Sequence, residues 1–166
     1  GYKCTEVLAY ILRATLDSDW RSQLENAGVT VTNSTYLMIA SPDSINANMA
    51  YNAIKLKSGI LVEHGENSEG ELSIWLSYPE IITPIDSTGL FANLGEIAFY
   101  TSGDHQVLFT SQTKIFDYFF AGTRVSCFNG SLSQISTSSA TSMKGMFSRS
   151  GSGSYMSFGS SGAFST

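Results

Sequence analysis

Hydrophobic positions near the amino terminus recur with the period of an α-helix. One apolar stripe is formed by Val7, Leu8, Ile11, Leu12 and Leu16. Thr5 and Glu6 suit the start of this helix, because a hydroxyl can cap free N–H groups and an acid favours the positive end of the helix dipole. Trp20 and Leu24 then share one face of a second short helix, which Gly28 can end. The pattern predicts a helix pair within residues 5–27, the first helix covering 5–16.

After Gly28 the hydrophobic period falls to two, which is typical of strands. Residues 36–40 form the first clear strand, and residues 53–62 read as two strands or one bulged strand, broken at Ser58-Gly59. Residues 71–78 alternate most regularly, with Leu72, Ile74, Leu76 and Tyr78 on one face. Ile81 and Ile82 lie between two prolines, which predicts an edge strand or a connector.

The next segments complete a mainly β domain. Residues 96–101 and 106–110 alternate on either side of Gly103-Asp104, which predicts a hairpin. Residues 114–121 are apolar on both faces and are expected to form a buried strand, and residues 125–128 a last one. We find no internal repeat. The expected fold class is α+β, with an N-terminal helix pair followed by a mainly antiparallel β-sandwich of six to eight short strands.

The composition changes at about residue 130. Residues 131–166 are rich in Ser and Gly, and contain Lys144 and Arg149 but none of the chain's 14 acidic residues. Such a segment has few apolar groups to bury, so we expect contacts with another copy of the chain or a neighbouring subunit to order it. We therefore divide the chain into a globular domain, residues 1–130, and a C-terminal extended arm, residues 131–166.

Aromatic residues spaced along this arm are the expected subunit contacts. Aromatic side chains on a background of small residues can insert into pockets of adjacent subunits. Trp75 is a further contact candidate, because it falls on the polar face of its predicted strand. The predicted contact residues are Phe147, Tyr155, Phe158, Phe164 and Trp75.

Charge and composition restrict the class of partner. The net charge is −5 and only 14% of residues are charged, so we expect no nucleic-acid binding through the general field of the protein. No apolar run approaches the roughly 20 residues that span a bilayer. Two cysteines, Cys4 and Cys127, leave a single disulfide and two buried thiols as open alternatives.

One acidic segment, residues 63–71, is the strongest candidate for metal chemistry. Its carboxylates could hold Ca²⁺, and His64 could join them on a softer metal. The spacing does not fit an EF-hand, and a solvated loop between strands explains the charges as well. We assign no catalytic residue and no cofactor, and we keep one outside candidate for a metal site: Glu63, Glu66, Glu69 and Glu71.

The layout of helix, compact β domain of low charge and long Ser/Gly arm resembles small virion structural proteins of tailed bacteriophages. The segment VLAYILRATLDSDWRSQLENAGVTV, residues 7–31, looks like the helix-then-strand openings of such capsid, tail or head-to-tail proteins. The resemblance implies a non-enzymatic subunit of a homo-oligomeric virion assembly, whose arm clamps neighbouring copies.

Two other functions fit the sequence. A secreted microbial filament or adhesive subunit explains the low charge and the glycosylation patterns at Asn33 and Asn129, and would place the protein outside the cell. A small metal-dependent hydrolase or lyase would instead use the acidic segment 63–71. We expect the structural subunit first, the secreted subunit second and the enzyme third.

Overall fold

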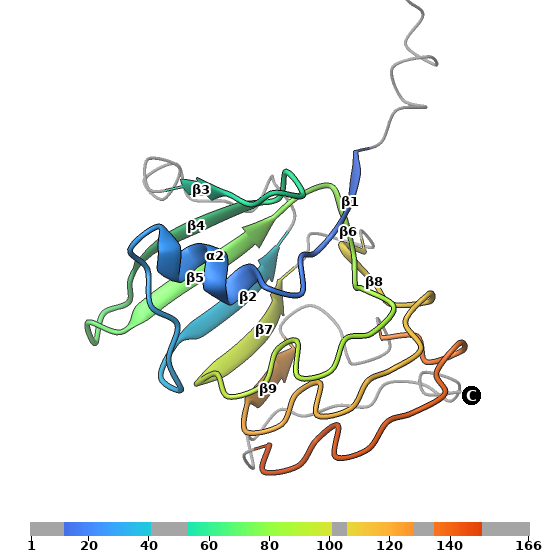
Figure 1. The fold of residues 1–166 in the computed structure, drawn as a ribbon. Coiled ribbons are helices and arrows are strands. Elements are labelled where there is room, and N and C mark those ends of the chain that lie inside the picture. Colours follow the sequence, from blue (N-terminus) through green and yellow to red (C-terminus); the bar gives the residue numbers. More distant parts are fainter. Residues whose placement is uncertain (1–11, 41–52, 101–105, 128–134, 151–166) are drawn as a thin grey trace, which may run out of the picture.

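A computed structural model describes residues 12–40, 53–100, 106–127 and 135–150. These residues form two β-sheets and one short α-helix (Figure 1). The elements are β1 (Arg13–Thr15), α2 (Trp20–Asn26), β2 (Tyr36–Ala40), β3 (Ala53–Lys55), β4 (Leu61–Glu66), β5 (Leu72–Ser77), β6 (Glu80–Ile82), β7 (Glu96–Tyr100), β8 (Leu108–Phe109) and β9 (Arg124–Cys127).

Most strands pair in parallel. The small sheet has the order β1-β6-β8 and the large sheet the order β3-β4-β5-β2-β7-β9. Every pairing is parallel except those of β4 with β3 and with β5, which are antiparallel. Parallel neighbours require the chain to return to the same end of a sheet before each new strand. The prediction of a mainly antiparallel sandwich is therefore wrong.

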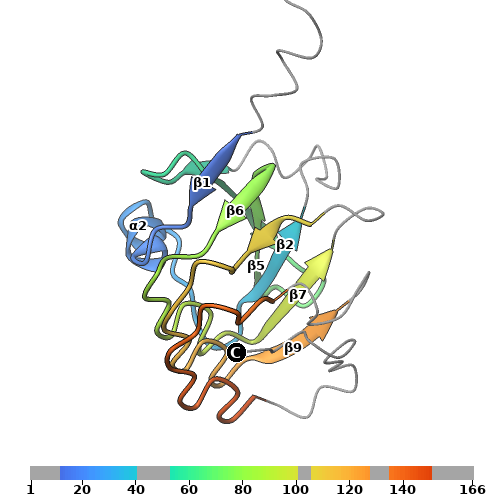
Figure 2. The same ribbon diagram turned by 90° about the vertical axis from the view of Figure 1, so that its right-hand side faces the viewer.

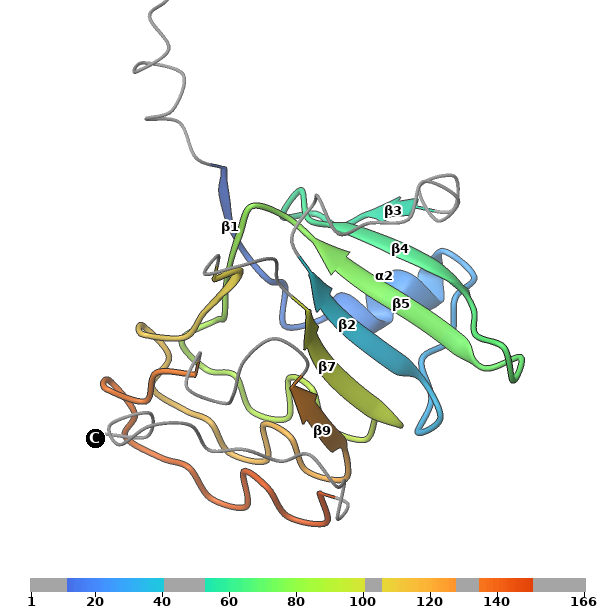
Figure 3. The same ribbon diagram turned by 180° about the vertical axis from the view of Figure 1, so that it is seen from behind.

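The chain returns by winding in coils. The first three coils each pass from a strand of the small sheet, through a connecting segment, to a strand of the large sheet, and the fourth coil stacks on the third without a strand of either sheet (Figures 1 and 2). Coil 1 is residues 13–40, coil 2 is 80–100, coil 3 is 106–127, and coil 4 is 135–150. The β3-β4-β5 meander is inserted between coils 1 and 2 and extends the large sheet beyond β2 (Figure 3). Such a stack, in which each coil contacts its neighbours, is a solenoid.

The connecting segments of coils 2, 3 and 4 share one backbone conformation, which we call the turn ribbon (residues 85–94, 114–123 and 141–150). N–H groups at every second position close turns three residues back, as in Phe119 to Phe116 (3.1 Å) and Ala121 to Tyr118 (3.0 Å). Each ribbon also has two left-handed residues at matching positions. These pairs are Gly89 and Asn93, Tyr118 and Gly122, and Gly145 and Arg149.

The remaining N–H groups of each ribbon join it to the next coil. Those of Phe91 and Asn93 in coil 2 donate to the carbonyls of Phe119 (3.0 Å) and Ala121 (2.7 Å) in coil 3. In the same way, Phe120 of coil 3 donates to Met146 of coil 4 (2.8 Å). The three ribbons therefore form a parallel ladder. Within residues 87–93 and 116–122 the N–H groups that cross between coils point toward the carboxyl-terminal end of the stack, whereas Lys114 and Thr141, at the start of the next two ribbons, donate back to the preceding coil.

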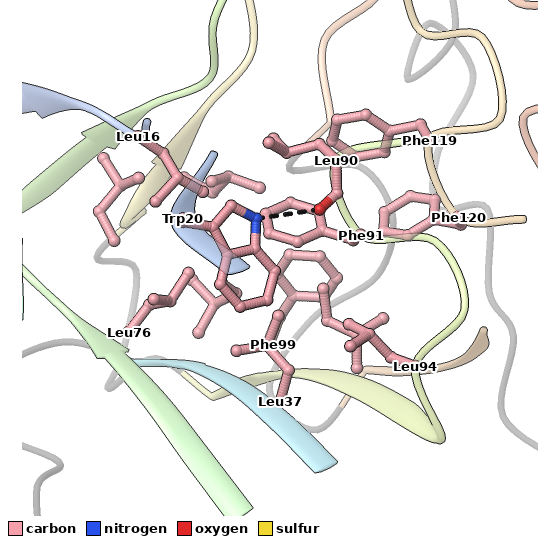
Figure 4. Packing of buried hydrophobic residues seen from close by; sticks show 14 of the residues in the cluster. Leu16, Trp20, Leu37, Leu76, Leu90, Phe91, Leu94, Phe99, Phe119 and Phe120 are labelled. Atoms are coloured by element: carbon pink, nitrogen blue, oxygen red, sulfur yellow. Dashed lines mark hydrogen bonds between the residues drawn. The ribbon is translucent and has the colours of Figure 1, made fainter. Parts of the chain in front are cut away.

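One hydrophobic core runs through all four coils. Trp20 and Leu24 of α2, which lies over one face of the large sheet, are fully buried in it. An aromatic column continues from Trp20 through Phe91 and Phe120 to Phe147, with ring centroids 6.4, 6.3 and 5.5 Å apart. Figure 4 shows Trp20, Phe91 and Phe120 within this cluster.

The prediction of an α+β fold that begins with a helix pair is wrong, because the described residues contain one short helix and nine strands. The second helix is confirmed as α2, with Trp20 and Leu24 buried as expected and Gly28 in a left-handed conformation just beyond its end. Residues 5–11 of the first predicted helix lie outside the described residues. Its remainder contains β1, which pairs in parallel with β6. A short segment of mixed polarity can satisfy its backbone hydrogen bonds as a helix or as a strand. Here pairing with β6 makes it a strand.

Strand positions were predicted better than strand partners. The strands β2, β5 and β9 are confirmed, and the break at Ser58-Gly59 does separate β3 from β4. The hairpin predicted for residues 96–110 is wrong, because β7 and β8 belong to different sheets. Residues 81–82 lie in β6, which is central rather than at an edge. Residues 114–121 form a turn ribbon rather than a strand, and bury the rings of Phe116, Phe119 and Phe120.

Candidate functional site

The amino-terminal end of the ribbon ladder is capped by α2. The indole Nε1 of Trp20 donates to the carbonyl of Leu90 at 3.1 Å (Figure 4), and the guanidinium of Arg21 donates to the same oxygen at 3.3 Å. In coils 3 and 4 the matching carbonyls, of Phe119 and Met146, accept backbone N–H groups from the preceding coil. The Trp20 indole therefore takes the place of a backbone donor, and α2 caps this end of the ladder at the Leu90 carbonyl.

The other end of the ladder has no such cap among the described residues. The N–H groups of Met143, Gly145 and Arg149 occupy the positions that donate to the next coil in coils 2 and 3. Within residues 12–40, 53–100, 106–127 and 135–150 they have no hydrogen-bond acceptor. We call this row of N–H groups on coil 4 the donor edge. Coil 4 contributes Lys144 and Arg149 and no acidic side chain, while the Asp117 carboxylate of coil 3 accepts from the Ser142 hydroxyl and the Lys144 N–H.

Side chains at left-handed positions lie over glycines of the following coil. A Cβ atom on Gly122 would come within 2.6 Å of Asn93 Oδ1, and one on Gly145 within 2.6 Å of Tyr118 Cε1. The glycines thus have two functions: they adopt a positive φ without strain, and they leave room for the neighbour above. Arg149 is the left-handed residue at the matching position of coil 4.

Phe147, one of the predicted subunit contacts, packs within its own chain. Its ring is half-buried and stacks on Phe120 at 5.5 Å with an interplanar angle of 28°. It also packs against the main core, to which Ile135 and Met146 of the same coil belong. The other three predicted contacts in this region, Tyr155, Phe158 and Phe164, lie outside the described residues.

Trp75 lies on the face of the large sheet opposite α2. It is half-buried and packs against a small cluster formed by Met38 and Ala98, which are its successive neighbours across β2 and β7. Residues of β5 on either side of it, Ile74 and Leu76, point into the main core. Trp75 thus lies on the face of β5 that points away from the main core, as the alternation of side chains along this strand predicts.

The acidic segment 63–71 forms the end of β4, a turn and the start of β5. Glu63 is buried on β4 and burial raises its pKa, while Glu66 and Glu69 are exposed. Alternation along β4 places Glu63 and Glu66 on opposite faces of the sheet. Among the described residues, no three His, Cys, Asp or Glu side chains are grouped closely enough to hold a metal ion.

Two surface grooves contain charged side chains. The larger, about 360 Å³, lies at the end of the large sheet where β2, β7 and β9 begin, beside the β4–β5 turn, and includes Tyr36, Glu96 and Arg124. Arg124 Nε lies 2.7 Å from Glu96 Oε1, and burial together with the Glu96 charge raises the pKa of Tyr36 to about 12. The smaller groove, about 100 Å³, contains the Arg13–Glu80 ion pair. Each groove contains one acid paired with arginine, and the larger groove is also lined by Glu69 and Glu71 of the acidic segment, which form no ion pair within the described residues.

Comparisons of the chain with family models, curated proteins and solved structures found no match. The helical part of the described chain includes no segment of the length and apolarity needed to cross a bilayer. The unequal ends of the ribbon ladder are thus the feature on which a functional argument can be built. Sequence reasoning missed the donor edge, although Phe91, Phe120 and Phe147, each preceded two residues earlier by a left-handed position, mark the repeat that creates it.

Proposed function

We propose that the protein is a non-enzymatic structural subunit that works through contacts with other protein chains. The observation that supports this proposal best is the donor edge of coil 4. Backbone N–H groups without an acceptor usually find a partner in folded proteins, and the opposite end of this ladder shows how such an end is closed. A chain with one capped end and one open donor row is suited to joining another chain.

The setting of this assembly remains a proposal on the sequence resemblance. A virion of a tailed bacteriophage, with copies of the chain and other assembly subunits as partners, is the first setting. An extracellular filament or adhesive subunit is the second. The metal-dependent hydrolase is the weakest alternative, because Glu63 and Glu66 lie on opposite faces of β4 and so cannot converge on one ion.

The mass of the native particle tests this proposal. The full chain, tagged at its amino terminus, would be isolated under mild conditions from cells that produce it, and measured by light scattering or mass photometry. We expect a mass well above the 17.9 kDa of one chain. A parallel chain ending at Ser150, which keeps coil 4, separates contacts made by coil 4 from those predicted for Tyr155, Phe158 and Phe164. A native mass of one chain in both preparations would contradict the proposal.

A further inference from the structure

We infer that the larger surface groove, beside the β4–β5 turn, binds a neutral oligosaccharide. This binding function goes beyond the proposed subunit role and does not depend on it. The groove has a volume of about 360 Å³, which lies within the usual range for sites of small ligands. Its lining combines hydrogen-bond donors and acceptors with an aromatic ring, and this combination carries the inference.

One side of the groove is a row of side chains from adjacent parallel strands. Register places Tyr36 of β2 beside Glu96 of β7, and Glu96 beside Arg124 of β9 (Figure 3). All three side chains lie on the face of the large sheet opposite the main core, because the next residue of each strand is fully buried in that core. Parallel pairing therefore brings together groups that are far apart in the sequence.

Two turns hold the rest of the lining in place. In the β4–β5 turn, Asn67 Oδ1 accepts the N–H groups of Glu69 (3.0 Å) and Glu71 (2.9 Å). At the start of β7, Gly95 lies so close to Ser34 that a Cβ atom on it would come within 2.9 Å of the Ser34 carbonyl carbon. These contacts shape the groove before a ligand arrives, which lowers the entropy cost of binding.

The polar groups of the groove suit a ligand with hydroxyl groups. Arg124 donates through Nε to Glu96, while its terminal nitrogens and the Tyr36 hydroxyl have no hydrogen-bond partner within the described residues. Burial and the Glu96 charge raise the pKa of Tyr36 to about 12, so this hydroxyl stays protonated at neutral pH and can donate. Glu69 and Glu71 supply acceptors. A sugar hydroxyl both donates and accepts, so it can use both kinds of group.

Charge favours a neutral ligand over an ion. The carboxylates of Glu69, Glu71 and Glu96 line the groove together with the guanidinium of Arg124, so a phosphate or an acidic sugar would be repelled. A cation would be attracted to Glu69 and Glu71, but it has no acceptor to offer Tyr36 or Arg124 when it displaces their water. A neutral ligand with hydroxyl groups meets neither penalty.

Two aromatic side chains on this face suit the apolar side of a sugar ring. Tyr36 lines the groove, and Trp75 lies on the neighbouring strand β5, two positions further along in register. Both are half-buried and pack against Met38 and Ala98. The C–H groups of a sugar ring can pack on such rings while its hydroxyl groups face the polar lining. We therefore expect one sugar unit in the groove and a following unit toward Trp75.

Binding of the full chain to a printed array of neutral and acidic oligosaccharides tests the inference. Tetralysine serves as a separate probe for a cationic partner. The chain is produced in a host that does not glycosylate asparagine, so that Asn33, which also lines the groove, carries no sugar. We expect binding to neutral oligosaccharides that does not change with salt concentration, because salt screens only interactions between charges.

Two substitutions test whether the binding takes place in the groove. Tyr36→Phe removes the hydroxyl and keeps the ring, while Arg124→Lys keeps a cation for the ion pair and removes the planar guanidinium. In calorimetric titration with the tightest-binding oligosaccharide of the array, we expect each to raise the dissociation constant at least about tenfold. The matched controls are Tyr118→Phe, on the ribbon of coil 3, and Arg13→Lys, whose ion pair lies in the smaller groove. Both controls should bind as the parent chain does.

The absence of binding to every neutral oligosaccharide would overturn the inference, as would binding confined to acidic oligosaccharides or to tetralysine. A dissociation constant unchanged in both Tyr36→Phe and Arg124→Lys would also overturn it, since the sugar would then bind elsewhere. A native particle with the mass of one chain, combined with sugar binding that depends on Tyr36 and Arg124, would refute the proposed function and leave this inference intact. The two failures are therefore distinguishable.

Discussion

Glu63 is a buried carboxyl group in the β-sheet, and one of its oxygens, Oε2, has no hydrogen-bond partner among the residues that the structure describes. Removing a carboxylate from water without compensation disfavours its charged form, so burial raises the pKa of Glu63. Between the unfolded and the folded pKa, the folded chain binds more protons than the unfolded chain. This contribution to stability is therefore fully present below the unfolded pKa and is lost as pH rises through the folded pKa.

Replacing Glu63 by glutamine should remove this pH-dependent loss of stability. At pH 7 we expect Glu63→Gln to raise the free energy of unfolding by about 1 kcal/mol, because no charge is then buried. At about pH 4 the wild-type carboxyl is itself protonated, so the difference should shrink. Urea denaturation at both pH values measures it, with Glu66→Gln, at the exposed end of the same strand, as the control. A Glu63→Gln protein no more stable than wild type at pH 7 would refute this account.

Gly145 and Gly89 offer a matched test of the coil contacts. Both have a positive φ, 61° and 62°, so an alanine at either position costs about 1–2 kcal/mol in backbone strain. At Gly145 the new methyl group would also displace the Tyr118 ring, whereas at Gly89 the nearest atom is 3.9 Å away. We expect Gly145→Ala to reduce the free energy of unfolding more than Gly89→Ala. In a Tyr118→Ala background the two glycine substitutions should cost the same unfolding free energy. Equal costs in the wild-type background would contradict the close contact between Gly145 and Tyr118.

At the scale of elements, α2 acts as the cap of the ribbon ladder. Its Trp20 indole and Arg21 guanidinium both donate to Leu90, and Arg21 lies 5.1 Å from the centre of the Trp20 ring. Burial lowers the pKa of Arg21, as expected for a cation held away from water. The helix therefore contributes more than apolar surface, because its side chains supply the hydrogen-bond donors that a turn ribbon would supply in its place.

Changing Trp20 to phenylalanine should cost about 1 kcal/mol of unfolding free energy for the lost hydrogen bond, in addition to the packing change. Arg21 still donates to Leu90 in this variant. We therefore expect Trp20→Phe combined with Arg21→Met to cost more than the sum of the two single changes, because the Leu90 carbonyl then loses both partners. Additive losses in urea denaturation would show that the two donors do not share the capping role.

The sequence predicts elements that depend on local periodicity and misses those that depend on distant partners. The face of α2 and the alternation of β5 could be predicted, since each buries side chains at its own period. The partners of β7 and β8 could not, because alternation does not reveal whether a strand pairs in parallel with a distant strand or with the next one. Residues 114–121 read as a strand for the same reason: buried Phe116, Phe119 and Phe120 show no period of their own.

At the scale of the whole molecule, the coils are visible in the sequence only after their register is known. Thr83, Thr110 and Thr137 are equally spaced and all buried, one per coil. The Thr110 hydroxyl, for example, donates to the Ser136 carbonyl at 2.8 Å and accepts from the Ser136 N–H. The ribbon of coil 2 is offset by two residues from this spacing, and the two left-handed positions carry different residues in each coil. A repeat defined by backbone conformation rather than by residue type therefore escaped detection.

The donor edge, and with it the proposed subunit role, follows from this stacking, so amide exchange in the isolated full chain is the most direct test. At low micromolar concentration, the amides of Tyr118, Phe120 and Gly122 should exchange slowly, because each donates to coil 4 at 2.8 Å. Those of Met143, Gly145 and Arg149, at the matching positions of coil 4, should exchange at least about tenfold faster. Equally slow exchange at both sets of amides would mean that the ladder is already closed within a single chain, and would contradict the account.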